Sequence, residues 1–257
     1  MNTTLIDIHN HLLPEVDDGA ESWEESISMA QIAEKDGIST IVLTPHYGRA
    51  SNYRNISEVR DKFETLKETL NRNNINIELK LGFEVFLSIE TIQLIKQEGQ
   101  ILTIDSTRFI FVEFPFDFLY PNSKLLINWV LDSGLIPIIA HPERNSYFTS
   151  KPQLLFEMIE IGALSQVNIG SLQGVFGEKA KKYALFFLKN MWAQLIATDA
   201  HNTKSRPPVL SPAFKLLSRE MSEFEIQLFV SKNPASILEN KMPEFYPEKP
   251  KRRNILI

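Results

Sequence analysis

Short runs of apolar and β-branched residues alternate along the whole chain with longer stretches in which apolar positions recur at helical spacing. Runs of this kind, bounded by turn residues, are typical of buried strands. Seven of them predict strands at Leu5–His9, Thr40–His46, Ile77–Phe86, Phe109–Phe116, Gly134–His141, Leu164–Gly170 and Trp192–His201.

The stretches between these runs predict helices. The first, Ser22–Asp36, opens with Ser22 and Glu25 in the pattern of a capping box, and Gly37 stands where the helix is expected to stop. Further helices are predicted at Ser57–Arg72, Ile89–Glu98, Lys124–Asp132, Pro152–Ile161, Val175–Lys189 and Pro212–Val230.

The alternation of strand and helix predicts parallel strands joined by right-handed crossovers and covered on both faces. We therefore expect an α/β fold, a distorted TIM-like (β/α)7 barrel that forms a single domain over residues 1–245. An open doubly wound sheet fits the same alternation, although no glycine-rich phosphate loop follows the first strand. The basic segment 246–257 is expected to be a terminal tail, with contact to a membrane surface or a partner as the alternative.

Composition narrows the range of partners and mechanisms. The 257 residues include 27 Lys and Arg and 32 Asp and Glu, and the net charge of −5 argues against general nucleic-acid binding. The absence of cysteine excludes a disulfide scaffold and every mechanism that needs a thiolate nucleophile. No apolar run reaches the ~18 residues of a membrane span. The amino terminus lacks the features of a signal peptide, so we expect a cytoplasmic protein.

All five histidines lie at the carboxyl ends of predicted strands, which is the rim that carries the active site in α/β barrels. His9 and His11 are two residues apart, so their imidazoles share one face of a strand and can share a metal ion. Asp199 and His201 repeat this spacing on the last strand. A lone histidine is more often structural, but five on one rim, including His46 and His141, indicate a metal site.

Carboxylates bring oxygen donors to the same rim. Glu84 and Glu113 end two other strands, and burying Glu113 among phenylalanines requires a cation or a strong hydrogen-bond partner. The acidic loop after the first strand offers Asp17 or Asp18, and spacing alone does not choose between them. Four carboxylates and five imidazoles are more donors than one ion uses, so two or three metal ions are predicted, and manganese, iron or zinc suits the donor set.

Arginines follow two of the histidines. Arg144 and Arg206 carry planar guanidinium groups that match phosphate oxygens bidentately. An arginine more often forms an ion pair at the surface, but these two lie beside the rim that carries the predicted metal ligands. This position favours contact with a substrate. Tyr47 and Arg49, in the long loop after the second strand, are weaker candidates for substrate binding.

The ordered motifs resemble those of the polymerase-and-histidinol-phosphatase (PHP) superfamily. Within it they are most similar to the metal-dependent bacterial protein-tyrosine phosphatases of capsular and extracellular polysaccharide loci. The resemblance runs from about Leu5 to Asn240. It rests on Asp7-Ile8-His9-Asn10-His11, Val16-Asp17-Asp18-Gly19, Ala140-His141-Pro142-Glu143-Arg144, Gln166-Val167-Asn168, Asp199-Ala200-His201-Asn202 and Arg206-Pro207-Pro208.

This resemblance implies a PHP barrel with three metal ions, usually manganese, that hydrolyses phosphotyrosine on a bacterial tyrosine kinase controlling polysaccharide export. It implies one metal held by His9, His11, Glu84 and Asp199, a second by Glu84, Glu113 and His141, and a third by Asp18, His46 and His201. Arg144 and Arg206 would bind the substrate phosphate. Without cysteine, a phosphatase must activate water at a metal, and His201 is also a candidate proton donor to the leaving group.

Other functions fit part of this pattern. A small-molecule phosphatase of the same superfamily, such as one acting on histidinol phosphate, would need a deeper polar pocket. A nuclease would need a basic groove, and an amidohydrolase a strand-end lysine to bridge metals, which we do not find. A non-catalytic partner that caps a kinase tail would have no need for so many metal donors on one rim.

Overall fold

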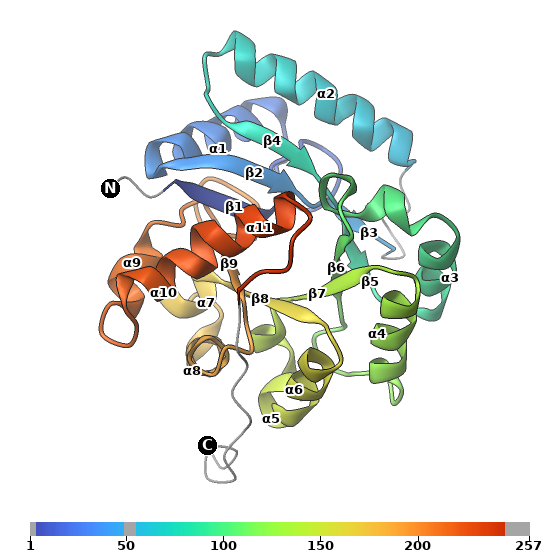
Figure 1. Cartoon of the computed structure of the whole chain (residues 1–257). Coiled ribbons are helices and arrows are strands. Elements are labelled where there is room, and N and C mark those ends of the chain that lie inside the picture. Colours follow the sequence, from blue (N-terminus) through green and yellow to red (C-terminus); the bar gives the residue numbers. More distant parts are fainter. Residues whose placement is uncertain (1–3, 49–54, 245–257) are drawn as a thin grey trace.

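Parallel strands form the centre of the molecule. The computed structural model describes residues 4–48 and 55–244 (Figure 1), so Arg49 and the predicted tail 246–257 lie outside the described residues. The strands pair as β1–β2–β4 and as β3–β5–β6–β7–β8–β9, and every pair is parallel, as predicted. Their bounds are β1 (Leu5–Asn10), β2 (Ile38–Leu43), β3 (His46–Tyr47), β4 (Glu78–Leu81), β5 (Glu84–Phe86), β6 (Phe109–Glu113), β7 (Ile136–Ala140), β8 (Leu164–Asn168) and β9 (Leu195–Ala197).

Two of the seven predicted strands are interrupted. The predicted strand Thr40–His46 consists of β2 and β3, and Ile77–Phe86 consists of β4 and β5. Pro45, which has no N–H to donate to a ladder, lies in the first interruption. Neighbouring chain still pairs across both gaps, because Gly82 N donates to Leu43 O at 2.8 Å and Glu84 N donates to Pro45 O at 3.1 Å.

The first and last strands are hydrogen-bonded neighbours. Asn10 forms a parallel bridge with Ala200 just beyond β9. Asp199 N donates to His9 O at 2.9 Å, and His11 N donates to Ala200 O at the same distance. β1 therefore lies between β2 and β9, and the residues after both strands come together at one place.

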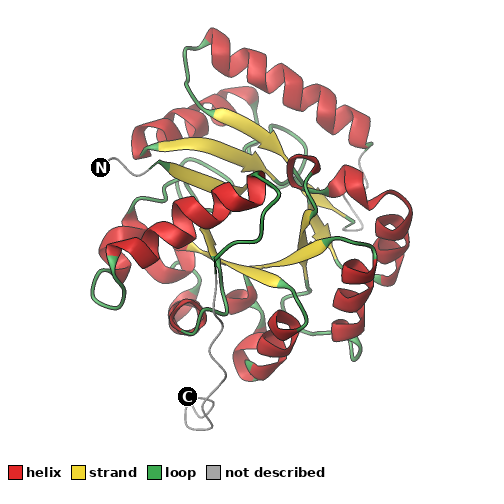
Figure 2. Cartoon of the chain, in the orientation of Figure 1, coloured by secondary structure: helices red, strands yellow, loops and turns green. Residues whose placement is uncertain are grey.

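The helices surround the strands (Figure 2). The first six predicted helices are present with boundaries shifted by at most two residues, and Ile89–Glu98 matches α3 at both ends. The bounds are α1 (Trp23–Asp36), α2 (Ile56–Arg72), α3 (Ile89–Glu98), α4 (Ser123–Asp132), α5 (Ser146–Ser150), α6 (Gln153–Glu160), α7 (Ile169–Gln173), α8 (Gly177–Lys189), α9 (Pro212–Leu217), α10 (Glu223–Gln227) and α11 (Asn233–Leu238), with short turns of helix η1 (Gly99–Leu102), η2 (Ile104–Ser106), η3 (Pro142–Arg144) and η4 (Leu228–Lys232).

Two local predictions are wrong. The predicted helix Pro212–Val230 is broken into α9, α10 and η4, because Ser222 caps a new helix in a reciprocal capping box with Glu225. At α1 only half of the predicted capping box forms. The Ser22 side chain accepts from Glu25 N, but the Glu25 carboxylate accepts from Glu21 N.

Alternation along the strands separates two apolar clusters. On β6, Phe109 and Phe111 belong to one cluster, and Ile110 and Val112 belong to the other. Since side chains of a strand alternate between faces, Glu113 continues the face of Phe109 and Phe111. The carboxyl end of this strand therefore turns a buried carboxylate toward the cluster that contains residues from β1, β7, β8 and β9. Within the described part of the chain, no helix has the length and apolar character to cross a membrane.

Candidate metal centre

The nine residues predicted as metal ligands converge at the carboxyl ends of the strands. Eight of them are buried, and only the Asp18 side chain, 61% exposed, reaches the surface. Two of the buried residues, His141 and Asp199, have left-handed backbones, with φ of 32° and 50°. Strain of this kind in non-glycine residues is concentrated at functional sites. A cavity of about 50 Å³ is lined by seven of the nine together with Phe116, Arg144 and Arg206.

Glu84 lies in the middle of the cluster. Its Oε2 is 3.4 Å from His9 Nε2, 3.4 Å from His11 Nε2 and 2.9 Å from His46 Nδ1. Its Oε1 is 2.8 Å from His141 Nε2. Glu113 lies beside it, with Oε1 3.7 Å from His141 Nε2. One carboxylate thus contacts imidazoles on both sides, as a bridging ligand would.

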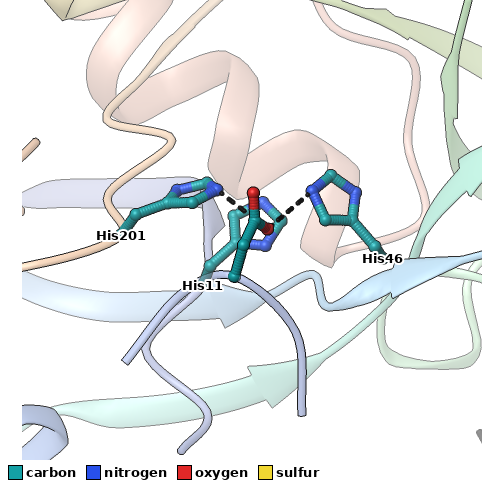
Figure 3. Close-up of side chains that lie close together, drawn as sticks. His11, His46 and His201 are labelled. Carbon is teal, nitrogen blue, oxygen red and sulfur yellow. Dashed lines mark ion pairs between the residues drawn. The ribbon is translucent and has the colours of Figure 1, made fainter. Parts of the chain in front are cut away.

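Asp18 lies on the outer side of the cluster. Figure 3 shows His46 and His201 directed from opposite sides toward one carboxylate, with His11 behind it. Asp18 Oδ1 is 3.2 Å from His46 Nε2 and 3.5 Å from His201 Nε2.

Asp17 faces away from the cluster and supports it. Its Oδ2 accepts from His11 Nδ1 at 2.7 Å and from His46 N at 3.0 Å, while Oδ1 accepts from Gly19 N at 2.9 Å. Gly19 allows this tight loop, because a Cβ there would lie 2.1 Å from His11 O. The structure therefore distinguishes the two adjacent aspartates, which their spacing in the sequence could not: Asp17 orients His11, and Asp18 lies between His46 and His201.

Three histidines donate Nδ1–H to an oxygen that is not itself a candidate metal-binding atom. His9 Nδ1 donates to Gln166 Oε1 at 2.9 Å, His11 Nδ1 donates to Asp17, and His201 Nδ1 donates to the carbonyl of Asp199 at 3.0 Å. In the neutral imidazole these bonds fix the tautomer and leave each Nε2 as a lone pair directed inward, which is how metal-binding histidines are usually oriented.

A chain of amides behind the cluster was not assigned a role from the sequence. Gln166 Nε2 donates to Asn168 Oδ1 at 2.8 Å, and Asn168 Nδ2 donates to Asp199 Oδ2 at 2.6 Å. The two residues alternate on β8, so both point to the same face. Their spacing in Gln166-Val167-Asn168 was the available signal, but only the fold shows that His9 and Asp199 are their partners.

The two predicted arginines meet at one carboxylate oxygen. Asp199 Oδ2 lies 2.8 Å from Arg144 Nη1 and 2.5 Å from Arg206 Nη2, while Oδ1 faces His9, His11 and His201 at 3.5 to 3.7 Å. Asp199 therefore connects the imidazole cluster to both guanidinium groups.

Tyr47, a weaker candidate for substrate binding, is not among the residues that line the cavity. It follows His46 on β3, and its ring packs edge-on against Phe83, with centroids 5.9 Å apart. Arg49 lies outside the described residues.

The pKa values show how much negative charge the cluster holds. Burial alone lowers the pKa of a histidine, yet the Glu84 carboxylate raises the pKa of His46 to about 11, and Asp17 raises that of His11 to about 9. On the other side, burial and the Arg144 cation lower the pKa of His141 to about 4. Burial opposes ionisation of Asp199, but Arg206 and the histidines hold its pKa well below the usual range.

The donor set fits divalent metal ions. His9 Nε2 and His11 Nε2 lie 3.2 Å apart, so in the neutral tautomers described above two lone pairs face each other, and a metal ion beside them would relieve this repulsion. Glu84 Oε2 and His46 Nδ1 are buried and have no hydrogen-bond partner among the described residues, despite their 2.9 Å separation. Nitrogen and oxygen donors without sulfur suit manganese, iron or zinc.

Three groups of donors within the described ranges are compact enough to hold an ion each. They are His11 with Asp18, His46 and His201; His9 with His11 and Glu84; and His46 with Glu84 and Glu113. These groups overlap the three ligand sets implied by the resemblance, but they share His11 and His46 differently and do not include His141 or Asp199.

Known proteins resemble this chain along almost its whole length. The family model for capsular polysaccharide synthesis, CpsB/CapC, matches residues 5–239. The tyrosine-protein phosphatase YwqE of Bacillus subtilis (strain 168) is 34% identical over 252 residues, which is 98% of each chain.

Solved structures agree. Among the crystal structures of YwqE from Bacillus subtilis and CpsB from Streptococcus pneumoniae, described as unique metal-dependent tyrosine phosphatases, one matches with a TM-score of 0.89 and 34% identity over 96% of this chain and 100% of that one. The phosphotriesterase homology protein from Escherichia coli matches with a TM-score of 0.58 over 92% of this chain and 99% of that one. At 12% identity this second match shows a likeness of fold alone.

Proposed function

The chain belongs to the CpsB/CapC family of capsular polysaccharide synthesis, and on this premise we propose that it is a metal-dependent protein-tyrosine phosphatase. The observation that carries the proposal is the buried cluster of imidazoles and carboxylates joined through Asp199 to two arginines. The first part suits metal ions and the second suits a phosphate. No thiol is present to act as the nucleophile instead.

We assign the ligands of three metal ions, with manganese as the expected metal. His9, His11, Glu84 and Asp199 would hold the first, Glu84, Glu113 and His141 the second, and Asp18, His46 and His201 the third. The central position of Glu84, with imidazoles on both of its oxygens, supports its bridging role. When bound, divalent ions lower the pKa of water toward neutrality and neutralise the charge of a phosphate.

Arg144 and Arg206 would bind the substrate phosphate. Both guanidinium groups are fixed at one end by Asp199, and their side chains are 17% and 21% exposed, so they border the cavity. Arg206 Nε is buried and has no hydrogen-bond acceptor in the part of the chain that the structure describes. This N–H is suited to a phosphate oxygen, and a planar guanidinium can offer two parallel bonds.

His201 is better suited to ligation than to proton donation. Its Nδ1–H is held by the Asp199 carbonyl, so its Nε2 carries a lone pair, and burial beside the His11 imidazole lowers its pKa. A tyrosinate leaving group, whose conjugate acid has a pKa of about 10, needs less protonation than an alkoxide does. Its departure therefore places little demand on a general acid.

The substrate we propose is a phosphotyrosine on a bacterial tyrosine kinase of polysaccharide synthesis. The cavity is small, about 50 Å³, and is lined by the candidate metal ligands themselves, so the body of a substrate would lie outside it. This favours a protein substrate over a small metabolite that a deep pocket would enclose. The cytoplasmic location stays a prediction.

The architecture we propose is a single distorted (β/α)7 barrel of the PHP type. Counting β2 with β3 and β4 with β5 leaves seven strand positions, and β1 is hydrogen-bonded to both its neighbours in the ring. This arrangement supports a closed barrel over an open doubly wound sheet, in which the first and last strands would not meet as they do here.

The test is phosphate release by metal-stripped protein to which manganese, zinc or magnesium is added back. Phosphotyrosine and phosphoserine peptides and histidinol phosphate would be compared. The variants would be His9→Ala/His11→Ala and Glu84→Gln, with Glu98→Gln at the exposed end of α3 as a matched control. We expect metal-restored release from phosphotyrosine in the wild type and Glu98→Gln only. Activity confined to histidinol phosphate would assign the protein to small-molecule metabolism, and no release at all would favour a non-catalytic partner.

A further inference from the structure

An aromatic ring packs against the two arginines that Asp199 holds. Phe176, between α7 and α8, has its ring centroid 4.1 Å from Arg144 Cζ and 5.7 Å from Arg206 Cζ. A second ring, Phe116 in the segment after β6, lies 4.8 Å from Arg144 Cζ. Phe116 also stacks on His141, with centroids 5.5 Å and planes 24° apart. Two rings thus contact Arg144, and one of them continues to Arg206.

Glycines build the turn that presents Phe176. Gly174 and Gly177 have φ of +87° and +88°, a left-handed conformation that other residues adopt only with strain. At Gly170 a Cβ would approach Phe176 Cε2 to 3.1 Å, so the absent side chain allows the ring to pack close to α7. The glycines on both sides of Val175-Phe176 therefore allow the backbone turn that places the Phe176 ring.

Each guanidinium contacts both a carboxylate oxygen and an aromatic ring. Asp199 Oδ2 forms an ion pair with both guanidinium groups. Aromatic rings near a guanidinium restrict the tilt of its plane and leave the remaining N–H groups free. Bidentate binding of phosphate depends on the orientation of that plane, and a small misplacement of a positioning group is costly in catalysis.

We propose that Phe176 is a positioning residue, which acts together with Phe116 to hold the planes of Arg144 and Arg206 in the orientation that binds the substrate phosphate. This inference rests on the proposed function, because it assumes that the arginines bind phosphate. Phe176 itself is not among the residues that line the cavity, so by this reasoning it acts through the arginines and not on the reacting atoms.

The test compares Phe176→Leu, which keeps an apolar side chain without the aromatic face, with Phe176→Tyr, which keeps the ring. We expect Phe176→Leu to lower kcat/KM on a phosphotyrosine peptide about tenfold, mainly through KM, as the loss of a partly desolvated cation–π contact implies. Inorganic phosphate should bind the metal-loaded protein correspondingly more weakly. Phe176→Tyr should restore both values, and metal content should be that of the wild type in each variant.

A matched control is available on another part of the molecule. Phe224 on α10 is 54% exposed and packs on the Lys232 cation at 3.9 Å, so Phe224→Leu removes a contact of the same kind away from the site. We expect it to leave kcat/KM unchanged. A fall equal to that of Phe176→Leu would overturn the inference, since the effect would then follow from any lost aromatic contact.

A double-mutant cycle separates positioning from a general structural role. If Phe176 acts through Arg144, its replacement by leucine should have a much smaller effect in an Arg144→Lys background. The proposal would be overturned if Phe176→Leu lowered kcat/KM by the same factor in the wild type and in Arg144→Lys. It would also be overturned if Phe176→Leu had wild-type kinetics. If the wild type itself releases no phosphate, the proposed function fails, and the comparison of inorganic phosphate binding then decides the role of Phe176.

Discussion

Replacing Asp17 by asparagine should weaken metal binding although Asp17 is not a candidate ligand. Asp17 Oδ2 accepts two bonds, from His11 Nδ1 and His46 N, and Oδ1 accepts from Gly19 N. Asparagine has only one acceptor oxygen. If that oxygen stays on His11, the new NH₂ group meets the N–H of Gly19. If it turns to Gly19, the NH₂ donates to His11 Nδ1 and drives the proton to Nε2, the atom that faces the cluster.

Either outcome disturbs His11 as a ligand. Loss of a partner that orients a metal-binding histidine typically costs about 10- to 100-fold in metal affinity, which is about 1.4 to 2.8 kcal/mol. The side chain of Asp17 is fully buried, so water cannot replace the lost acceptor. We therefore expect the upper part of this range.

The assay is calorimetric titration of the metal-stripped protein with Mn²⁺, together with the Mn²⁺ concentration that gives half-maximal phosphate release. Asp61→Asn, at an exposed position of α2, is the matched control and should keep the wild-type affinity. Wild-type affinity in Asp17→Asn would refute the argument, because it would mean that Asp17 does not set the tautomer of His11.

Three further outcomes follow from the same geometry. Burial raises the pKa of Glu143 from 4.5 to about 7. The folded state therefore favours the protonated acid, and the wild type loses stability as the pH rises from 4.5 through 7. Glu143→Gln should therefore gain about 3 kcal/mol of unfolding free energy relative to the wild type between pH 4.5 and pH 8; a difference in urea denaturation that does not change with pH would contradict this. Gly19→Ala should lower the free energy of unfolding by about 1–3 kcal/mol or more, because its Cβ would lie 2.1 Å from His11 O. The control Gly37→Ala has nothing within 4 Å of its Cβ, so the same denaturation experiment should show only the cost of its positive φ. Adding Mn²⁺ at 100 times its dissociation constant should raise stability by about 2.7 kcal/mol for each independent site, seen as a higher Tm that a chelator reverses; a Tm that does not respond to the metal would count against the metal centre.

Much of the fold was predictable because it depends on local patterns. Apolar runs of strand length and helical spacing are properties of neighbouring residues, and they located all seven strand positions and the bodies of six of the seven predicted helices. The interruptions within one strand and one helix were not predicted, because the residues that cause them were not recognised in the sequence. Pro45 interrupts a strand, and Ser222 starts a new helix inside a stretch whose apolar spacing looked continuous.

The candidate site was predictable in outline for a related reason. Parallel strands bring their carboxyl ends to one rim, so residues that end strands must gather there whatever their separation in the chain. His9, Glu84, Glu113 and His141 were expected together on this ground alone, and they lie within one buried cluster.

The sequence by itself thus determined the order of the elements, the rim and the types of donor on it. Only the tertiary structure decided which atom faces which. It placed Asp17 against Nδ1 of His11 and Asp18 between His46 and His201, brought Gln166 to His9 across 157 positions of sequence, and placed Phe176 on the two arginines. These choices depend on distances of a few ångströms between distant segments, and such distances arise from packing rather than from any periodicity along the chain.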